Sequence, residues 1–209
     1  MSICSKGRPV NSASTEVAAR KVMDAAAASV KIVVAGGFGV GKTTFVGSVS
    51  EITPLITEAV MTSASTGTDD LSHTPEKTTT TVAMDFGRIT LGAGLILHLF
   101  GTPGQRRFWF MWDDLIHGAI GAIVLVDTRR LTDSFSAIDY FEAAGLPFII
   151  AINGFNGDFP HGVAEVRDAL SVSARVPVVE CDARERSLTV ATLTTLVEQA
   201  MAGRRQDRS

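Results

Sequence analysis

Apolar runs and amphipathic stretches alternate along most of the chain. The short apolar, β-branched runs are typical of buried strands, and the stretches between them carry apolar residues at helical spacing. This pattern predicts strands at residues 30–35, 81–90, 95–100, 120–126, 148–152 and 176–179, and helices at residues 42–50, 105–117, 133–144, 163–170 and 187–202. Because strands alternate with helices, we expect an α/β fold in which right-handed crossovers build a mostly parallel six-stranded sheet with helices on both faces.

Two segments interrupt this alternation. The runs at residues 81–90 and 95–100 are separated only by Gly92-Ala93-Gly94, which predicts a β-hairpin and therefore one antiparallel edge strand. Residues 50–80 contain many threonines and serines together with two prolines, so we expect them to be irregular. A loop of this length in a compact domain is typically functional or disordered.

Composition indicates a single compact domain. Of the 209 residues, 45% are hydrophobic and 20% are charged, which is sufficient for a buried core. We expect the domain to span residues 30–203, with a flexible or helical arm at residues 1–29 and a disordered tail at residues 204–209. The formal net charge of −3 argues against a protein that holds nucleic acid by bulk electrostatics.

Cysteine usage and hydropathy bear on the compartment. Cys4 and Cys181 lie far apart, without the spacing of a metal site, which favours a reduced, cytoplasmic protein. No apolar run is long enough to cross a bilayer, so no integral membrane segment is expected. Attachment to the periphery of a membrane signalling complex remains open.

A glycine-rich segment between the first strand and the first helix carries the most specific chemistry. It fits the phosphate-binding pattern G-x-x-x-x-G-K-[ST] in the required context of strand, loop and helix. Its glycines let backbone N–H groups approach a phosphate, Lys42 supplies a cation for the β- and γ-phosphates, and Thr43 supplies a hydroxyl ligand for Mg²⁺. The alternative is a glycine-rich turn that binds nothing. The predicted nucleotide-binding residues of this segment are Gly36, Gly37, Phe38, Gly39, Val40, Gly41, Lys42, Thr43 and Thr44.

Three further polar motifs follow predicted strands, beginning at Gly101, Asn153 and Glu180. Ligands of parallel sheets bind outside the carboxyl ends of the strands. We therefore expect these motifs to converge with the glycine-rich loop at one edge of the sheet.

With these motifs, the chain resembles the small Ras-like GTPases, and more narrowly the bacterial MglA-type proteins and the ATP/GTP-binding proteins of actinomycete conservons (CvnD-like). The resemblance covers residues 30–202. It is carried by the glycine-rich loop, Thr81-Val82-Ala83-Met84-Asp85-Phe86, Thr102-Pro103-Gly104-Gln105, Asn153, and Glu180-Cys181-Asp182-Ala183-Arg184. It implies a P-loop NTPase fold, binding of GTP and GDP, and Mg²⁺ as the cofactor.

The resemblance assigns roles near the phosphates. Thr81 matches a threonine that senses Mg²⁺ and the γ-phosphate, so Thr43 and Thr81 are the expected metal ligands. Gly104 matches a glycine whose N–H reports the γ-phosphate. Gln105 matches the glutamine that orients the attacking water, so Gln105 and Lys42 are the expected catalytic residues. The residues alone leave alternatives open, namely strand propensity for Thr81 and a helix cap for Gln105.

The resemblance also assigns roles around the base. Asn153 matches an asparagine that ties loops together and touches the base, and Asn156 ends the same motif. Ala183 matches a residue whose backbone N–H binds the guanine carbonyl oxygen, and its neighbours Asp182 and Arg184 belong to the same loop.

Two departures from the family pattern affect the predicted chemistry. Gly101 stands where the usual motif has an aspartate that holds Mg²⁺ through water, although MglA-like proteins also lack that aspartate. Asn156 stands where the usual motif has an aspartate that accepts two hydrogen bonds from guanine, and an asparagine offers one acceptor and one donor. Asp158 lies close enough in sequence to substitute.

Aromatic residues crowd the helix after Gln105. Phe108, Trp109, Phe110 and Trp112 cannot all face one side of a helix, so an exposed aromatic surface beside Arg106 and Arg107 is expected. By resemblance, a Roadblock-type regulator docks on this face, against Phe108, Trp109 and Trp112. The alternative is that these rings belong to the core.

The sequence thus favours a GTP-binding switch with slow, Mg²⁺-dependent hydrolysis. Two alternatives remain. One is a non-hydrolysing nucleotide-binding scaffold in a signalling complex, which Gly101 and Asn156 favour. The other is an ATP-using P-loop protein, which the missing guanine-binding aspartate permits.

Overall fold

The computed structural model describes residues 28–61, 80–92, 94–104 and 106–206. Its strands are β1 (Ser29–Gly36), β2 (Leu55–Met61), β3 (Thr80–Leu91), β4 (Leu95–Gly101), β5 (Ala119–Val126), β6 (Phe148–Asn153) and β7 (Val178–Cys181). Its helices are α2 (Lys42–Val49), α3 (Trp112–Ile116), α4 (Thr132–Ala144), α5 (Val163–Leu170) and α6 (Arg186–Gln206), with 3-10 turns η1 (Arg106–Met111) and η2 (Thr128–Arg130). The helix expected before residue 29 lies outside the described residues.

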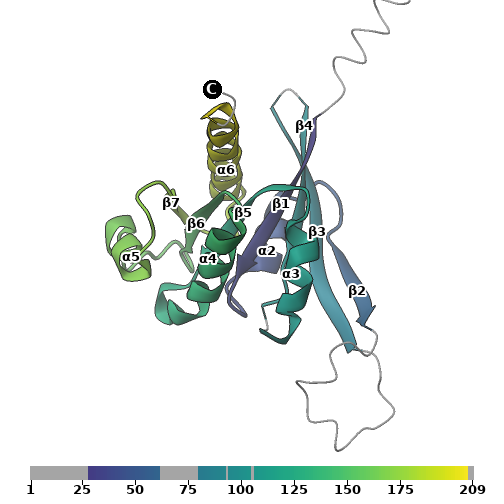
Figure 1. Ribbon diagram of the computed structural model, residues 1–209, viewed down its shortest axis with the longest axis horizontal. Helices are drawn as coiled ribbons and strands as arrows, with labels where there is room; N and C mark the ends of the chain where they lie inside the picture. Colours follow the sequence, from purple (N-terminus) through teal and green to yellow (C-terminus); the bar gives the residue numbers. More distant parts are fainter. Residues whose placement is uncertain (1–27, 62–79, 93, 105, 207–209) are drawn as a thin grey trace, which may run out of the picture.

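The strands form a single twisted sheet in the order β2-β3-β4-β1-β5-β6-β7. The pairs β1–β4, β1–β5, β5–β6 and β6–β7 are parallel, whereas β3 is antiparallel to both of its neighbours. The α/β fold, the mostly parallel sheet and the β3–β4 hairpin are therefore confirmed (Figure 1).

The edge of the sheet next to the hairpin differs from expectation. Residues 50–80 were expected to be irregular, but Leu55–Met61 forms β2, which pairs antiparallel with the first half of β3. The sheet consequently has seven strands, and β3, the one antiparallel strand, lies second from the edge. The pairing of β2 joins segments separated by the undescribed residues 62–79, so no local pattern indicated it.

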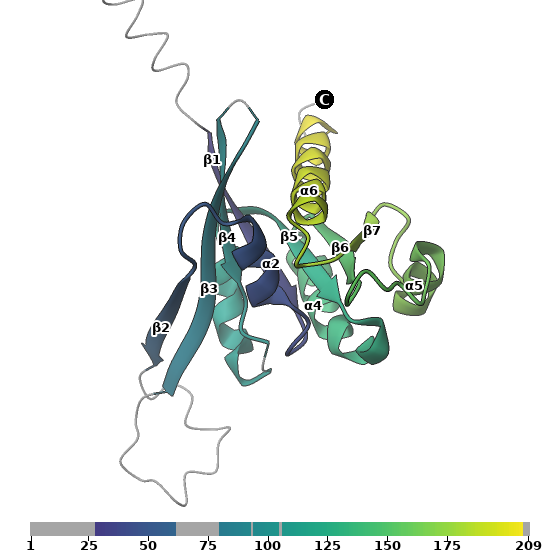
Figure 2. The same ribbon diagram turned by 180° about the vertical axis from the view of Figure 1, so that it is seen from behind.

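Helices cover both faces of the sheet. α2 and α6 pack on one face and α3, α4 and α5 on the other, as the two opposite views show (Figures 1 and 2). β1 illustrates why its sequence is continuously apolar. Ile32 and Val34 enter the core under α2 and α6, whereas Val33 and Ala35 enter the core under α3, α4 and α5. Among the described residues, no helix is long and apolar enough to cross a membrane.

The carboxyl ends of the parallel strands meet at one edge of the sheet. β1 ends there at Gly36, β4 at Gly101, β6 at Asn153 and β7 at Cys181. β3 runs in the opposite direction, and its Asp85 lies opposite Gly101. Every motif expected to bind the nucleotide therefore begins at this edge.

Candidate nucleotide-binding site

The glycine-rich loop between β1 and α2 needs glycine at specific positions. Gly36 and Gly41 have φ angles of +137° and +107°, which favour glycine. A Cβ on Gly36 would lie 2.4 Å from the carbonyl oxygen of Leu125, and one on Gly41 would lie 2.8 Å from Nδ2 of Asn153. The loop therefore packs closely against the ends of β5 and β6.

Lys42 lies at the start of α2 and is almost fully buried, with 8% of its surface exposed. Its Nζ donates hydrogen bonds to the carbonyl oxygens of Gly36 (2.9 Å) and Gly37 (2.8 Å). Burial lowers the pKa of the Lys42 ammonium to about 8, and the nearby Asp85 carboxylate opposes that shift. The loop is thus wrapped around a desolvated cation that has no carboxylate hydrogen-bonded to it among the described residues.

A cavity of about 410 Å³ opens at this cation. The segment after β4 lies against the loop, since a Cβ on Gly104 would be 2.8 Å from Nζ of Lys42 and 3.0 Å from the backbone nitrogen of Phe38. The structure therefore brings the predicted phosphate residues together with Gly104. The lining residues are Phe38, Gly39, Gly41, Lys42, Thr43, Thr44, Asp85, Thr102, Pro103 and Gly104.

The side chain against Thr43 is Asp85, a residue that the sequence analysis did not single out as functional. Thr43 Oγ1 donates a hydrogen bond of 2.7 Å to Asp85 Oδ2. Thr102 lines the same cavity, is 3% exposed, and its Oγ1 has no hydrogen-bond partner within the described part of the chain. Thr43 and Asp85 therefore bring two oxygen-bearing side chains to the cavity, whereas the Thr102 hydroxyl oxygen is buried beside it.

Thr81, the second expected metal ligand, is described only by its backbone, and its role at the metal site stays a prediction. In the structure, the backbone of Thr81 is in β3, opposite Val60 of β2. It precedes Asp85 by four strand residues, which corresponds to about 13 Å along an extended strand. The side chain that the structure places against Thr43 is that of Asp85.

Asn153 connects the phosphate end of the site to the base end. It is 7% exposed, donates from Nδ2 to the carbonyl oxygen of Val40 (2.9 Å), and accepts at Oδ1 from the backbone N–H of Ala183 (2.9 Å). It ties the loops together, as expected. The Ala183 N–H, however, was expected to bind a base carbonyl, and in this structure it is engaged by Asn153.

Asp182 and Arg184 brace the loops around the expected base position. The Asp182 carboxylate accepts from the backbone N–H groups of Gly157 and Arg184 and from Nε and Nη2 of Arg184. These bonds, led by those from the Arg184 side chain, lower the pKa of Asp182 to about 2. Arg184 Nη1 also donates to Oδ1 of Asn156, whose φ is +62°. The acceptor oxygen of Asn156 is thus already engaged.

Two aromatic residues near Asn156 were not predicted to shape this region. A Cβ on Gly154 would lie 2.3 Å from the Phe159 ring, so that ring fills the space of a side chain at position 154. Phe155 lies under the Arg129 guanidinium, whose central carbon is 3.9 Å from the ring centroid. Arg129 is in turn held by two hydrogen bonds to Asp127. Asp158 forms only a β-bridge to Phe155 and no described side-chain bond to the site.

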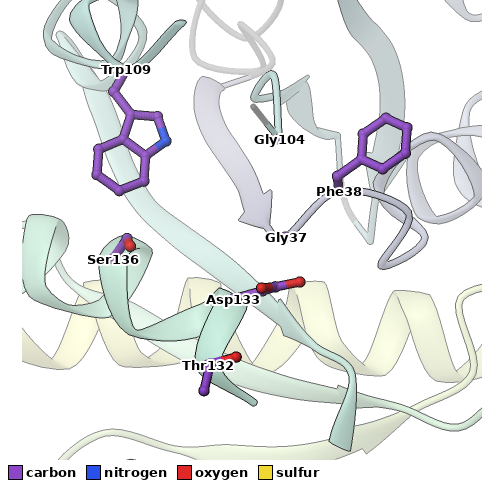
Figure 3. Close-up of a pocket in the computed structure, with 7 residues that line it drawn as sticks. All are labelled: Gly37, Phe38, Gly104, Trp109, Thr132, Asp133 and Ser136. Atoms are coloured by element: carbon purple, nitrogen blue, oxygen red, sulfur yellow. The ribbon is translucent and has the colours of Figure 1, made fainter. Parts of the chain in front are cut away.

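A second cavity, of about 370 Å³, lies on the other side of Gly104. Figure 3 shows Gly104 between the rings of Phe38 and Trp109, with Asp133 and Ser136 of α4 opposite them. The Phe38 ring is 67% exposed, and Arg130 Nη2 donates to the Phe38 carbonyl oxygen (2.9 Å). The phosphate loop is therefore flanked by a groove that reaches α4.

The predicted aromatic docking surface needs correction. Phe108 is buried and Trp112 is only 3% exposed. The Trp112 ring stacks on Phe141 of α4, with centroids 5.7 Å apart. Trp109 is half-buried at the second cavity, and Phe110 is the exposed ring of this segment. Gln105 and the side chains of Arg106 and Arg107 lie outside the described residues.

Comparisons with known proteins also indicate a nucleotide-binding fold. Residues 34–203 match the family described as conserved hypothetical ATP binding proteins. An uncharacterized protein of Methanocaldococcus jannaschii is 32% identical over 126 residues, which cover 59% of this chain and 69% of that protein.

Solved structures of the cytosolic part of an iron transporter, FeoB, share the fold. The apo T. maritima cytosolic domain superposes with a TM-score of 0.60 at 18% identity and covers 82% of this chain, while this chain spans only 64% of that domain. The G-domain of FeoB from Methanococcus jannaschii gives a TM-score of 0.54 at 15% identity, over 83% of this chain and 98% of that domain. The chain therefore belongs to the family of conserved hypothetical ATP binding proteins, and it has the nucleotide-binding P-loop fold of GTPases.

Proposed function

We propose that the protein is a GTP-binding switch of the MglA-type or conservon kind that hydrolyses GTP slowly with Mg²⁺. The observation that carries this proposal is the contact between Gly104 and the Lys42–Phe38 part of the phosphate loop. A γ-phosphate entering beside Lys42 meets the segment after β4 directly, so occupancy of the site is coupled to the position of that segment.

The residues of the cavity supply the expected chemistry. Lys42 and the loop N–H groups stabilise charge that develops on the transferred phosphoryl group, and Gln105 positions the attacking water. The hydroxyl of Thr43 and the carboxylate of Asp85 are hard oxygen donors of the kind that Mg²⁺ prefers. When bound there with a nucleotide, Mg²⁺ would neutralise phosphate charge.

Binding of a fluorescent GTP analogue to the wild type and to Lys42→Ala tests the proposal. Loss of a desolvated cation and its charge-assisted hydrogen bonds to phosphate should weaken binding about 100- to 1,000-fold. Lys31→Ala is the matched control, because Lys31 donates to the backbone of Asp114 and His117 and lies over the Phe100 ring, and none of these residues lines the cavity. Equal binding by Lys42→Ala and the wild type would contradict the proposal.

Hydrolysis needs a separate measurement. Phosphate release under single-turnover conditions should fall about 10- to 100-fold in Gln105→Ala, since misplacing the water removes much of the positional advantage, while GTP affinity stays unchanged. A wild type that binds GTP but releases no phosphate would support the non-hydrolysing scaffold instead.

An ATP-binding role is a second candidate. It is favoured by the family description and by the asparagine at position 156, which has no carboxylate and whose amide oxygen already accepts a hydrogen bond from Arg184. Competition between GTP, ATP and XTP for the wild-type site separates the two roles. A preference for ATP would replace the GTP assignment and leave the phosphate site intact.

We further propose that a Roadblock-type regulator docks beside the phosphate loop. The exposed Phe38 lies against Gly104, and the exposed Phe110 follows in η1, so a partner that contacts both residues would sense the position of the Gly104 segment. Phe110→Ala should weaken capture of the regulator, whereas Met201→Ala, which shortens an exposed side chain on α6, should not.

A further inference from the structure

A small apolar groove lies at the edge of the sheet opposite to the nucleotide site. It has a volume of about 80 Å³ and is formed by the first residues of β1, β4 and β5 and by the carboxyl-terminal half of α6, which meet at this edge (Figures 1 and 2). Ala200 at the groove is 3% exposed, whereas Met201 at its rim is 54% exposed. All of the lining side chains are apolar, so the groove favours an apolar occupant. They are Val30, Leu95, Ile120, Val197, Ala200 and Met201.

The chain enters the sheet beside this groove. Ala28 is the first described residue, and its carbonyl oxygen accepts a hydrogen bond of 2.8 Å from the backbone N–H of Ile96. Ile96 is the neighbour of Leu95, which lines the groove, and Val30 lines it two residues after Ala28. Two residues of an extended strand span about 7 Å. The segment before Ala28 is therefore attached to the domain within one side chain's reach of the groove.

That segment carries an apolar stripe in its sequence. Ala18, Ala19, Val22, Met23 and Ala26 recur at helical spacing, and in a helix they would share one side. Arg20, Lys21 and Asp24 would lie on the other side. Val22 and Met23 are the two large apolar residues between positions 18 and 27. A helix of this pattern needs an apolar surface for one face, and its alanines would let it approach that surface closely.

We propose that residues 18–27 dock on this groove as a helix, with Val22 and Met23 against its apolar lining. These two residues precede Ala28 by about 8 Å of helix, which is comparable to the distance from Ala28 to Val30 along β1. Attachment at Ala28 keeps the segment at a high local concentration, an advantage that a separate partner lacks. The groove is thus an intramolecular docking site, and it is independent of the nucleotide that the opposite edge binds.

Trypsin cleavage after Arg20 and Lys21 in the full chain tests the proposal. A docked segment should be cut slowly, and Met201→Asp, which places a charge on the rim of the groove, should raise the cleavage rate about tenfold. Leu188→Asp is the matched control, because Leu188 is also an exposed apolar residue of α6 but does not line the groove. Equal cleavage of the wild type and Met201→Asp would overturn the proposal.

A second variant keeps the test independent of the stability of α6. Val22→Ser with Met23→Ser changes only residues before β1 and should raise cleavage as much as Met201→Asp does. Unchanged cleavage in this variant would also overturn the proposal.

Dilution identifies the occupant. Protection by the chain's own segment should be unchanged on about hundredfold dilution, whereas protection by a second copy would be lost, which would overturn intramolecular docking. All of these rates are measured without nucleotide, so they stand even if the wild type fails to bind GTP.

Discussion

At the scale of single residues, the pKa of Lys42 depends on whether phosphate is bound at the site. Its ammonium is desolvated and hydrogen-bonded only to neutral carbonyls, and its pKa is lowered to about 8. Bound phosphate stabilises the charged form and raises that pKa. Above pH 8, binding must therefore be accompanied by proton uptake.

Nucleotide affinity should consequently fall with rising pH above about 8, by up to about tenfold per pH unit, and be flat just below it. Isothermal titration at pH 8.5 in two buffers of different ionisation enthalpy should show uptake of a fraction of a proton. Lys42→Met should show neither effect. A wild-type affinity that is independent of pH between 7.5 and 9 would mean that Lys42 stays charged in the empty site.

Asn156 and Arg184 determine how the base end responds to substitution. Because Arg184 already donates to position 156, the carboxylate of Asn156→Asp would pair with that guanidinium rather than with guanine. The single variant should therefore gain little preference for GTP over ATP. Asn156→Asp with Arg184→Ala should gain about 10- to 100-fold, the value of charge-assisted hydrogen bonds.

Arg184→Ala alone is the control and should not raise the preference for GTP. Competition binding with both nucleotides provides the measurement. A full gain in Asn156→Asp alone would show that Arg184 moves away from position 156 when the base binds.

For single residues, the sequence predicted the positions of those that belong to a local motif. Lys42 and Thr43 follow from the loop pattern, and Asn153 ties the loops as expected. The contact of Asp85 with Thr43 was missed because the two residues lie on different elements, forty-two positions apart in the sequence. The burial of Trp112 was missed because its partner ring, Phe141, belongs to a different helix.

Among the elements, β3 depends on close contact with α2. A Cβ on Gly87 of β3 would lie 2.6 Å from Val46 Cγ1 and 3.2 Å from Ser50. Gly87→Ala should therefore destabilise the fold by about 1–3 kcal/mol, since a methyl group overpacks the contact. Gly203→Ala is the control. It lies in α6 with nothing within 4 Å of the added Cβ, so it should stabilise the protein by up to about 1 kcal/mol. In thermal unfolding, Gly87→Ala should lower the melting temperature and Gly203→Ala should raise it. A melting temperature of Gly87→Ala equal to that of the wild type would show that α2 moves away without a cost in stability.

The elements that the sequence predicted best have strong periodicity and clear ends. α5 was predicted with its observed bounds, and β1 and β5 were predicted to within one residue at each end. β2 was missed because Leu55–Met61 lies in a stretch dominated by threonine, serine and proline, and because its partner strand follows 62–79. Edge strands paired on one side carry a weaker apolar signal than buried ones.

At the scale of the whole molecule, the order and direction of the strands bring the site together. Five segments that are distant in sequence meet at one edge of the sheet, and two separate cores hold the sheet between its helical layers. The strands β1 and β3–β7 were predictable from their apolar patterns, whereas β2 was not, and the polar motifs that follow the parallel strands predicted the edge at which they meet. The contacts between side chains across that edge could not be predicted, because contacts between loops depend on strand register and on side-chain rotamers.

The close approach of positions 85 and 101 also limits which pairs of residues this fold can accept. A Cβ at position 101 would lie 3.0 Å from both Cβ and Oδ2 of Asp85, which is tighter than an ordinary contact between side chains. Substitutions at the two positions are therefore coupled, because a side chain gained on β4 has to be accommodated by a smaller or displaced side chain on β3.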